Sequence, residues 1–360
     1  MSASAAPPTA NGSRQARRID RVLYYDVLNV AACLAVLLLH FNGLAHAYSP
    51  TFAWLQALAV ECAFYWAVPI FFMLSGATLL RYRERYDTVE FLKKRFSRTV
   101  VPFLAWSLLA LVWKVGTGQM PAPMGPRTVI NLILNTQIID VYWFFIPLFA
   151  LYLSFPVLSL LCDGSHDRTL WYLVGVAFVC NSVLPCVLPM VGIQLNPSLM
   201  LPVASGYLIY PVLGYLLSKT DLTRVQRMGI YVVGLVSLVL RYTATVIDSY
   251  ASHELAQPFW GYTYFPCLLL SVAVFVFARQ VRWSRIFGTP RRERILARVA
   301  GGSFGVYLLH MIFFWYALQV TGLDGGRLSW RTVMPFVAYA ICLAITLVLK
   351  RIPVIQRLVP

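Results

Sequence analysis

The sequence predicts an all-α membrane protein, a polytopic bundle of about ten transmembrane helices with both ends of the chain on the cytoplasmic side. The 360 residues are 59% hydrophobic and only 12% charged, whereas a soluble domain carries roughly a quarter charged residues. The apolar residues fall in runs close to the ~20 residues that one helix needs to cross a bilayer. These runs are continuous rather than alternating, which favours helices over a closed barrel.

The apolar runs divide the chain into a tail, a membrane domain and a second, short tail. We place helices over residues 22–44, 53–80, 99–115, 141–161, 170–190, 201–218, 228–247, 260–278, 302–320 and 332–350. Residues 1–21 are rich in Ala, Pro, Ser and Arg, which predicts a disordered cytoplasmic tail. The membrane domain is expected to span residues 22–350, and residues 351–360 to form a short cytoplasmic tail. The first apolar run is too long for a signal-peptide core, so we expect it to remain as a helix.

The net charge of +16 reflects membrane topology rather than nucleic acid binding. With the N-terminus inside, 25 of the 30 Lys and Arg residues fall in predicted inside segments. This asymmetry follows the positive-inside rule and makes anionic lipid, not nucleic acid, the expected partner of the basic loops. The five remaining basic residues, which the prediction places outside, are Lys114, Arg127, Arg241, Arg327 and Arg331.

The first predicted helix carries a stripe of polar residues, which are costly inside a membrane and by default mark function. At about 100° per residue, Asn29 and His40 lie about 20° apart, and Asp26 lies about 40° from His40. Histidine is the side chain best suited to move a proton near neutral pH, so His40 is a candidate general base. The alternative is a histidine near the helix end that bonds a carbonyl group or water.

The second predicted helix carries Glu61 and, on roughly the same face, Ser75. Because this helix runs from outside to inside, Glu61 is expected in the outer half of the membrane, at a depth comparable with His40. A carboxylate beside an imidazole fixes the tautomer of the ring and supports the imidazolium, so Glu61 is a candidate partner of His40. The alternative is a glutamate that bonds another helix.

Three further features point to a ligand, to function or to a water-filled interior. Arg95 and Arg98 are three residues apart in a basic loop, so on a helix both point the same way and suit a phosphate; plain positive-inside charge is the alternative. His310 is expected several residues into the membrane from the inside, either functional or bonded to a neighbouring helix. Prolines in or at the ends of several helices free carbonyl groups, which usually line a cavity at membrane depth.

Taken together, these segments resemble the acyltransferase 3 family of integral-membrane O-acyltransferases. The segment from Tyr25 to His40 is similar to the family's aspartate–leucine–arginine opening, with a histidine 14 residues after the aspartate. Four further segments are similar to the family. Val68–Gly76 resembles its Pro-Phe-Phe-Ser-Gly segment, and Arg95–Arg98 with Pro102 and Trp106 resembles its Arg-x-x-Arg loop. Trp143-Phe144 with Pro156 resembles its tryptophan-bearing fourth helix, and Ser303–His310 resembles its Ser-Phe-Gly-x-Tyr-Leu-x-His segment. The resemblance covers residues 22–350, and in one place the chain departs from it. Asn29 stands where the family usually has an arginine, and asparagine supplies no charge.

The resemblance implies transfer of an acyl group, usually acetyl, from cytoplasmic acyl-CoA to a hydroxyl of a glycan or lipid-linked sugar. It also implies a multi-pass protein of the bacterial inner membrane, of the stand-alone type that acts on surface polysaccharide or common antigen. Arg95 and Arg98 would then clamp the CoA phosphates with Ser75 beside them, and His40 would act as general base with Glu61 orienting it. Further candidate site residues are Asp26, Asn29, Trp143 and His310.

Two alternatives stay open at this stage. A transporter or exporter of polysaccharide units also needs a wet interior, although no internal repeat of the kind common in transporters is visible in the sequence. Another is the membrane-bound O-acyltransferase family, whose histidine lies in a differently patterned chain. No metal is expected, because most of the seven cysteines fall inside predicted helices without metal-ligand spacing.

Overall fold

A computed structural model describes residues 22–322 and 324–360, and throughout these ranges the chain is helical or irregular, without strands. The prediction of a disordered tail over residues 1–21 lies outside them. Seven helical stretches are long and apolar enough to cross a membrane: Leu23–His40, Phe52–Glu84, Thr88–Gly116, Asp140–Leu161, Asp167–Met190, Arg224–Ser252 and Pro290–Thr321. The predicted all-α polytopic bundle is confirmed, and each of the ten predicted segments contains at least one helix.

The helices follow one another along the chain in a simple order. The long stretches are built from α1 (Leu23–His40), α2 (Phe52–Phe64), α3 (Ala67–Leu79), α4 (Thr88–Arg95), α5 (Val101–Gly116), α7 (Phe145–Leu158), α8 (Asp167–Ala177), α9 (Leu184–Met190), α11 (Arg224–Ser252) and α14 (Pro290–Thr321). The shorter helices are α6 (Pro126–Leu134), α10 (Ile209–Lys219), α12 (Phe265–Gln280), α13 (Ser284–Phe287), α15 (Leu328–Thr332) and α16 (Met334–Leu349).

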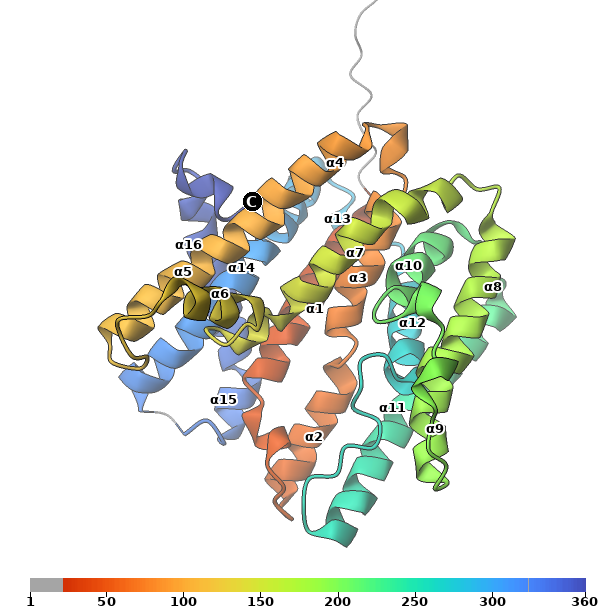
Figure 1. Ribbon diagram of the computed structural model, residues 1–360, viewed down its shortest axis with the longest axis horizontal. Coiled ribbons are helices and arrows are strands. Elements are labelled where there is room, and N and C mark those ends of the chain that lie inside the picture. The colour runs from red at the N-terminus through yellow and green to blue at the C-terminus, as the bar shows by residue number, and fades with distance from the viewer. Residues whose placement is uncertain (1–21, 323) are drawn as a thin grey trace, which may run out of the picture.

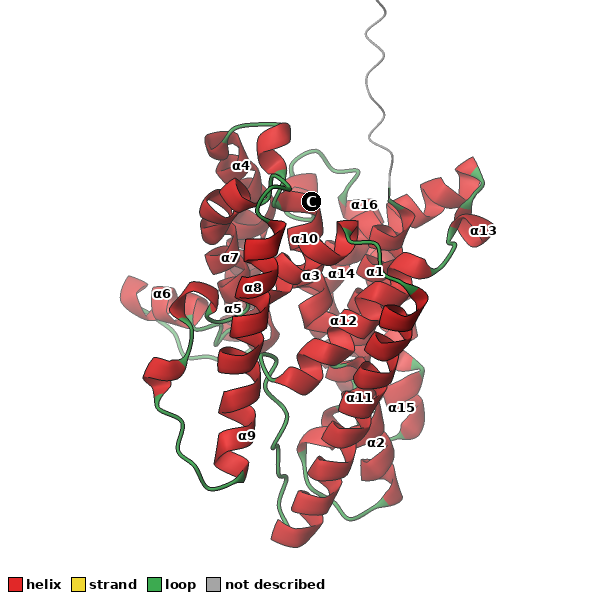
Figure 2. Cartoon of the chain, turned by 90° about the vertical axis from the view of Figure 1, so that its right-hand side faces the viewer, coloured by secondary structure: helices red, strands yellow, loops and turns green. Residues whose placement is uncertain are grey.

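Charge is segregated along the bundle axis. Figure 1 shows α4, α13 and the C-terminal end of the chain at one end of the bundle, with α2, α9 and α15 at the opposite end; Figure 2 shows the same division from the side. We call the first the basic end, because it carries the arginine-rich and lysine-rich segments 81–98 and 279–298. A bundle with its basic segments gathered at one end is the arrangement that the positive-inside rule describes.

Close helix packing is achieved with small residues. A Cβ atom at Gly76 of α3 would lie 1.9 Å from the carbonyl oxygen of Pro211 in α10, and one at Gly214 would lie 1.9 Å from that of Met73. At Gly302 and Gly305 of α14 an added Cβ would overlap side chains of α16. Backbones that approach this closely are typical of membrane bundles, where dispersion contacts rather than water exclusion hold helices together. Helix α1 packs against α3, α14 and α16 and so lies in the interior.

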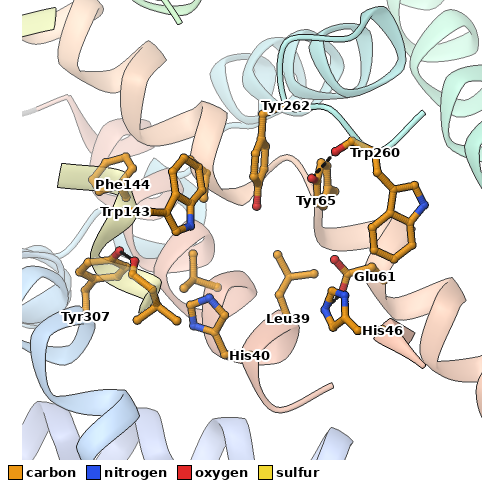
Figure 3. A pocket seen from close by; sticks show the side chains of 13 residues that line it. Leu39, His40, His46, Glu61, Tyr65, Trp143, Phe144, Trp260, Tyr262 and Tyr307 are labelled. Atoms are coloured by element: carbon orange, nitrogen blue, oxygen red, sulfur yellow. Dashed lines mark hydrogen bonds and ion pairs between the residues drawn. The ribbon is translucent and has the colours of Figure 1, made fainter. Parts of the chain in front are cut away.

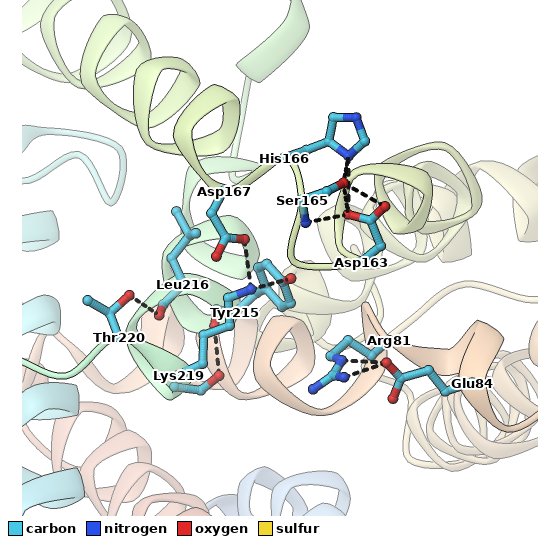
Figure 4. A network of polar contacts seen from close by, with 11 residues as sticks. Arg81, Glu84, Asp163, Ser165, His166, Asp167, Tyr215, Leu216, Lys219 and Thr220 are labelled. Atoms are coloured by element: carbon cyan, nitrogen blue, oxygen red, sulfur yellow. Dashed lines mark hydrogen bonds and ion pairs between the residues drawn. The ribbon is translucent and has the colours of Figure 1, made fainter.

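Polar contacts hold loops together at the basic end. Figure 4 shows the Nζ atom of Lys219 between the carboxylate of Asp167 and the hydroxyl of Tyr215, each at 2.7 Å. In the loop before α8, the hydroxyl group of Ser165 and the ring of His166 hold the pKa of Asp163 well below its usual range. These contacts join the start of α8 to the end of α10.

Two predicted helices need correction, and the structure adds detail to two further predictions. The helix predicted over 302–320 begins twelve residues earlier, at Pro290, because charged residues in its first turns extend it beyond the apolar run. Arg241, placed outside by the charge count, is 2% exposed within the long helix α11. The helix predicted over 53–80 is divided at residues 65–66 into α2 and α3, and Pro69 sits in the first turn of α3, where a missing N–H is tolerated. Residues 351–360, predicted as a short cytoplasmic tail, contact the bundle: Val359 is buried and the indole of Trp106 donates to the carbonyl of Leu358 at 2.9 Å.

Candidate active site

A cavity of about 180 Å³ lies where α1 ends and where the chain breaks between α2 and α3. Its polar and aromatic lining residues are His40, His46, Glu61, Tyr65, Trp143, Phe144, Trp260, Tyr262 and Tyr307. We call it the histidine cavity. Three of the sequence-predicted site residues, His40, Glu61 and Trp143, therefore share one cavity. Figure 3 shows the His40 ring facing Trp143, with Glu61 and His46 close together beyond Leu39.

The ring of His40 is oriented by a second histidine. Its Nδ1 atom lies 2.7 Å from Nε2 of His310, and Nδ1 of His310 lies 2.6 Å from the carbonyl oxygen of Tyr307. A carbonyl oxygen only accepts hydrogen bonds, so the proton of a neutral His310 is on Nδ1 and its Nε2 atom accepts. His40 then donates from its own Nδ1 atom. The Nε2 atom of His40 is left with a free lone pair, which is the state that a general base requires.

His310 lies deeper than the sequence predicted. Because α14 begins at Pro290, His310 is twenty residues into its helix, or about 30 Å along it. That length carries the fully buried His310 ring to the level of His40, at the far end of α1 from the basic end. The side chain bonded to His40 is therefore His310 rather than Glu61, which lines the same cavity but contacts a different histidine.

Glu61 belongs to a second polar group in the cavity wall. Its Oε2 atom lies 3.8 Å from Nε2 of His46, which is close but too long for a hydrogen bond. Burial, and then the charge of Arg241, lower the pKa of His46, which favours the neutral ring near pH 7. The amide of Asn42 donates to the carbonyl of Ala57 at 2.7 Å and fixes the loop that carries His46 beside α2.

A buried cation backs the aromatic wall of this cavity. The guanidinium carbon of Arg241 lies 3.4 Å from the ring centroid of Tyr65, whose ring in turn stacks on Tyr262 at 4.2 Å and 4°. Tyr262 is stacked on Trp143 with a centroid distance of 5.3 Å. None of the three guanidinium nitrogens of Arg241 has a hydrogen-bond partner among the described residues. Cation–π contact with a desolvated guanidinium is worth about 2 kcal/mol, so the stack offsets part of the cost of burying this charge.

Most of this aromatic wall was not found from the sequence. Tyr65 stands at the break between α2 and α3, and Trp260 and Tyr262 stand in the irregular segment before α12. A helical-face argument does not reach residues in irregular segments. The hydroxyl of Tyr65 donates to the carbonyl of Trp260, which joins the two irregular segments directly. A usable signal was the density of aromatic residues in the run Phe259 to Phe265.

A second cavity, of about 320 Å³, opens on the side of the bundle toward the basic end. We call it the arginine cavity. It collects four sequence-predicted site residues from three separate helices, namely Asp26 and Asn29 of α1, Ser75 of α3 and Arg95 of α4. The Nε atom of Arg95 is buried there without a hydrogen-bond partner among the described residues, and its guanidinium carbon lies 5.8 Å from the ring centroid of Tyr152.

Arg98 is placed differently from Arg95. Residues 96–100 form a π-helical turn between α4 and α5, so residues three apart no longer share a face as they do on an α-helix. Arg98 is exposed and does not line the arginine cavity. Asn29 stands where the family usually has an arginine. The guanidinium group of Arg95 supplies positive charge to the cavity that Asn29 lines. The amide of Asn29 itself donates to the carbonyl of Ala300 at 3.1 Å.

The two cavities are neighbours. Phe144, which follows Trp143 in the turn before α7, lines both of them. Its ring packs on Phe72 at 4.9 Å between centroids and on Tyr307 at 5.8 Å. Phe144 therefore forms part of the wall of the cavity at His40 and of the cavity at Arg95.

Comparison with known proteins identifies the family. A family model described as an acyltransferase domain matches residues 22–350 of this chain. The chain belongs to the acyltransferase 3 family. Neither a curated protein nor a solved structure matches it. As a member of this family the protein is a membrane acyltransferase, which favours acyl transfer over the transport alternative. The match covers both cavities and every residue discussed here as a site candidate.

Proposed function

We propose that this acyltransferase moves an acyl group, acetyl in the simplest case, from acyl-CoA to a hydroxyl of a glycan or lipid-linked sugar. The observation that carries this proposal is the shared wall at Phe144, with a partly buried arginine on one side and an oriented histidine on the other. A donor with a phosphate-bearing handle and an acceptor with a hydroxyl group need different surroundings, and the two cavities provide them next to each other.

On the donor side, the arginine cavity suits the anionic part of acyl-CoA. Arg95 presents a guanidinium group that no other described group fully satisfies, and guanidinium groups bind phosphate through paired hydrogen bonds. The hydroxyl of Ser75 donates to the carbonyl of Phe71 at 2.9 Å. Its oxygen can therefore still accept a hydrogen bond from an N–H or O–H group of the acyl-CoA. The exposed Arg98 and Lys93 beside this cavity add charge for CoA or for anionic lipid.

On the acceptor side, His40 removes the proton. The Nε2 atom of His40 accepts the hydrogen of the acceptor hydroxyl, the hydroxyl oxygen attacks the thioester carbonyl, and the C–S bond breaks. The proton then passes from the imidazolium to the released CoA thiolate, so His40 is regenerated. His310 stays neutral and keeps the His40 ring in the productive tautomer, as a third group does in other histidine-based sites.

The aromatic wall and Glu61 fit a sugar acceptor. Trp143, Tyr262 and Trp260 present flat apolar surfaces to the histidine cavity, and Glu61 presents a carboxyl group to the same space. Flat apolar rings match the C–H faces of a pyranose, and a carboxylate accepts hydrogen bonds from its hydroxyl groups. Because the basic end faces the cytoplasm under the positive-inside rule, the acceptor would enter from the opposite side of a bacterial inner membrane.

The proposal is tested by the surface glycans of the source cells. Cells with the intact gene and cells with the gene deleted are compared by mass spectrometry of their released surface glycans. A mass loss equal to one acyl group per modified unit, restored by the wild-type gene, is the expected result. Identical glycan masses, combined with no binding of acetyl-CoA to the purified protein in nanodiscs, would overturn the proposal.

A further inference from the structure

A third cavity lies beside the two already described and has no role in the steps above. It has a volume of about 300 Å³ and is lined by residues of α1, α3 and α14, by Phe144 and by the C-terminal Pro360. We call it the junction cavity. It shares Asn29, Phe71, Phe144 and Phe304 with the arginine cavity, and it shares Phe144 and Tyr307 with the histidine cavity.

The position of the junction cavity limits what can occupy it. A substrate group inside it lies between the arginine cavity and the histidine cavity. In the proposed reaction this is the part of the substrate between the CoA moiety and the base His40. In the proposed reaction that part is the acyl group, since CoA lies on the Arg95 side and the acceptor on the His40 side. The phenyl rings of Phe71, Phe144 and Phe304 make the lining chiefly apolar, which suits an alkyl chain.

The size of the cavity exceeds the needs of an acetyl group. An apolar cavity of about 150 Å³ in another protein holds benzene, a six-carbon ligand. The junction cavity has about twice that volume. An acetyl group has only one methyl group to place there, and would leave most of the space without contacts.

We propose that the junction cavity is an acyl-chain pocket and that this enzyme prefers an acyl-CoA whose chain is longer than acetyl, in the range of about four to eight carbons. This inference rests on the proposed acyl-CoA donor and names its acyl group more closely. Each methylene buried in an apolar site strengthens binding by up to about fourfold. Hexanoyl-CoA carries four more methylenes than acetyl-CoA, so an affinity at least about tenfold higher is expected even with incomplete burial.

Gly301 is an exposed residue of the cavity lining where a side chain can be added without displacing other atoms. It lines the cavity, and a Cβ atom built at Gly301 has no other atom within 4 Å. The backbone there is held by its carbonyl group, which accepts from Nζ of Lys350 at 2.6 Å and is retained in any substitution. Gly302 is unsuitable, because an added Cβ would lie 2.4 Å from Leu343.

The experiment measures binding of acetyl-, butyryl-, hexanoyl- and octanoyl-CoA to the purified protein in nanodiscs, by displacement of labelled CoA. Wild type is compared with Gly301→Ala and Gly301→Leu, and with Gly229→Leu as the matched control. Gly229 is an exposed glycine of α11, with open space around an added Cβ, that lines none of the three cavities. The leucine substitution therefore adds the same side chain to a helix without entering the pocket.

The expected result is a hexanoyl-to-acetyl affinity ratio of at least about ten in wild type and in Gly229→Leu. That ratio should fall stepwise through Gly301→Ala to near unity in Gly301→Leu. A wild-type ratio near unity, or a Gly301→Leu ratio equal to that of Gly229→Leu, would overturn the acyl-chain pocket. Failure of the proposed function looks different, since then neither CoA nor any acyl-CoA in the series would bind to the wild-type protein.

Discussion

The histidine cavity and the arginine cavity differ in how their polar groups are satisfied. In the histidine cavity the reactive ring is held on one side by a chain of two hydrogen bonds, from His40 to His310 and from His310 to the carbonyl of Tyr307. In the arginine cavity the Nε atom of Arg95 is buried with no partner among the described residues. A ring fixed in one orientation suits chemistry, because the geometry must be set before the reaction. A cation without a hydrogen-bond partner suits binding, because the ligand supplies the missing partner.

Substitution of His40 is expected to have the largest effect on acyl transfer. His40→Ala should abolish acyl transfer, with a loss of at least about 10²-fold to 10⁴-fold, because it removes the general base. Acetyl-CoA binding should remain within about twofold of wild type, since His40 does not line the arginine cavity. The readouts are acylated glycan in cells and CoA displacement on the purified protein. Normal glycan acylation in this variant would remove His40 from the mechanism.

His310 tests whether the hydrogen-bonded chain matters. His310→Ala leaves His40 free to adopt the other tautomer and rotamer, so kcat should fall about 100-fold with little change in the KM for acyl-CoA. His310→Gln keeps an amide oxygen that can accept from Nδ1 of His40 and should recover part of the lost rate. Equal rates for the two variants would mean that the ring of His310 fills space rather than orients His40.

Arg95 and Arg98 test the binding side of the comparison. Arg95→Ala should raise the KM for acyl-CoA about 10-fold to 100-fold, because it removes a charge-assisted contact inside the cavity. Arg98→Ala is the matched control, with the same change of charge at an exposed position three residues away, and should have the smaller effect. A larger effect at Arg98 than at Arg95 would place the CoA phosphates on the outside of the π-helical turn.

The smallest expected effect is a pH dependence at His46. Burial and Arg241 lower the pKa of His46, so the unfolded chain binds its proton more readily than the folded protein does. The free energy of unfolding therefore falls as the pH drops below about 6.5, the ordinary value for histidine. His46→Gln should lose less thermal stability than wild type between about pH 7.5 and pH 5.5. An identical decline in both proteins would show that a group other than His46 controls acid stability.

The sequence predicted more of the arginine cavity than of the histidine cavity. Asp26, Asn29, Ser75 and Arg95 were all singled out from their patterns, because each lies on a helix or a basic loop where spacing indicates direction. Tyr65, Trp260 and Tyr262 were missed, since they stand in irregular segments whose path depends on tertiary contacts. Arg241 was counted among the outside charges, and its stack on Tyr65 was not visible from spacing.

Histidine pairing was also beyond the sequence. Glu61 was the expected partner of His40, because carboxylate–imidazole pairs are common and the two residues were predicted at similar depths. The partner of His40 depends on where α14 starts. Hydropathy does not distinguish charged residues at the start of a helix from a loop. With Pro290 as the first residue of α14, His310 reaches the ring of His40, and Glu61 is left to His46.

The central claim is that donor and acceptor enter from opposite ends of the bundle and meet at Phe144. Membrane vesicles from the source cells test it most directly, with radiolabelled acetyl-CoA or hexanoyl-CoA supplied only from outside. Inverted vesicles, which expose the basic end, should incorporate label into their enclosed glycan, and those carrying His40→Ala should not. Label incorporated equally by right-side-out vesicles, or by inverted vesicles with His40→Ala, would contradict the account.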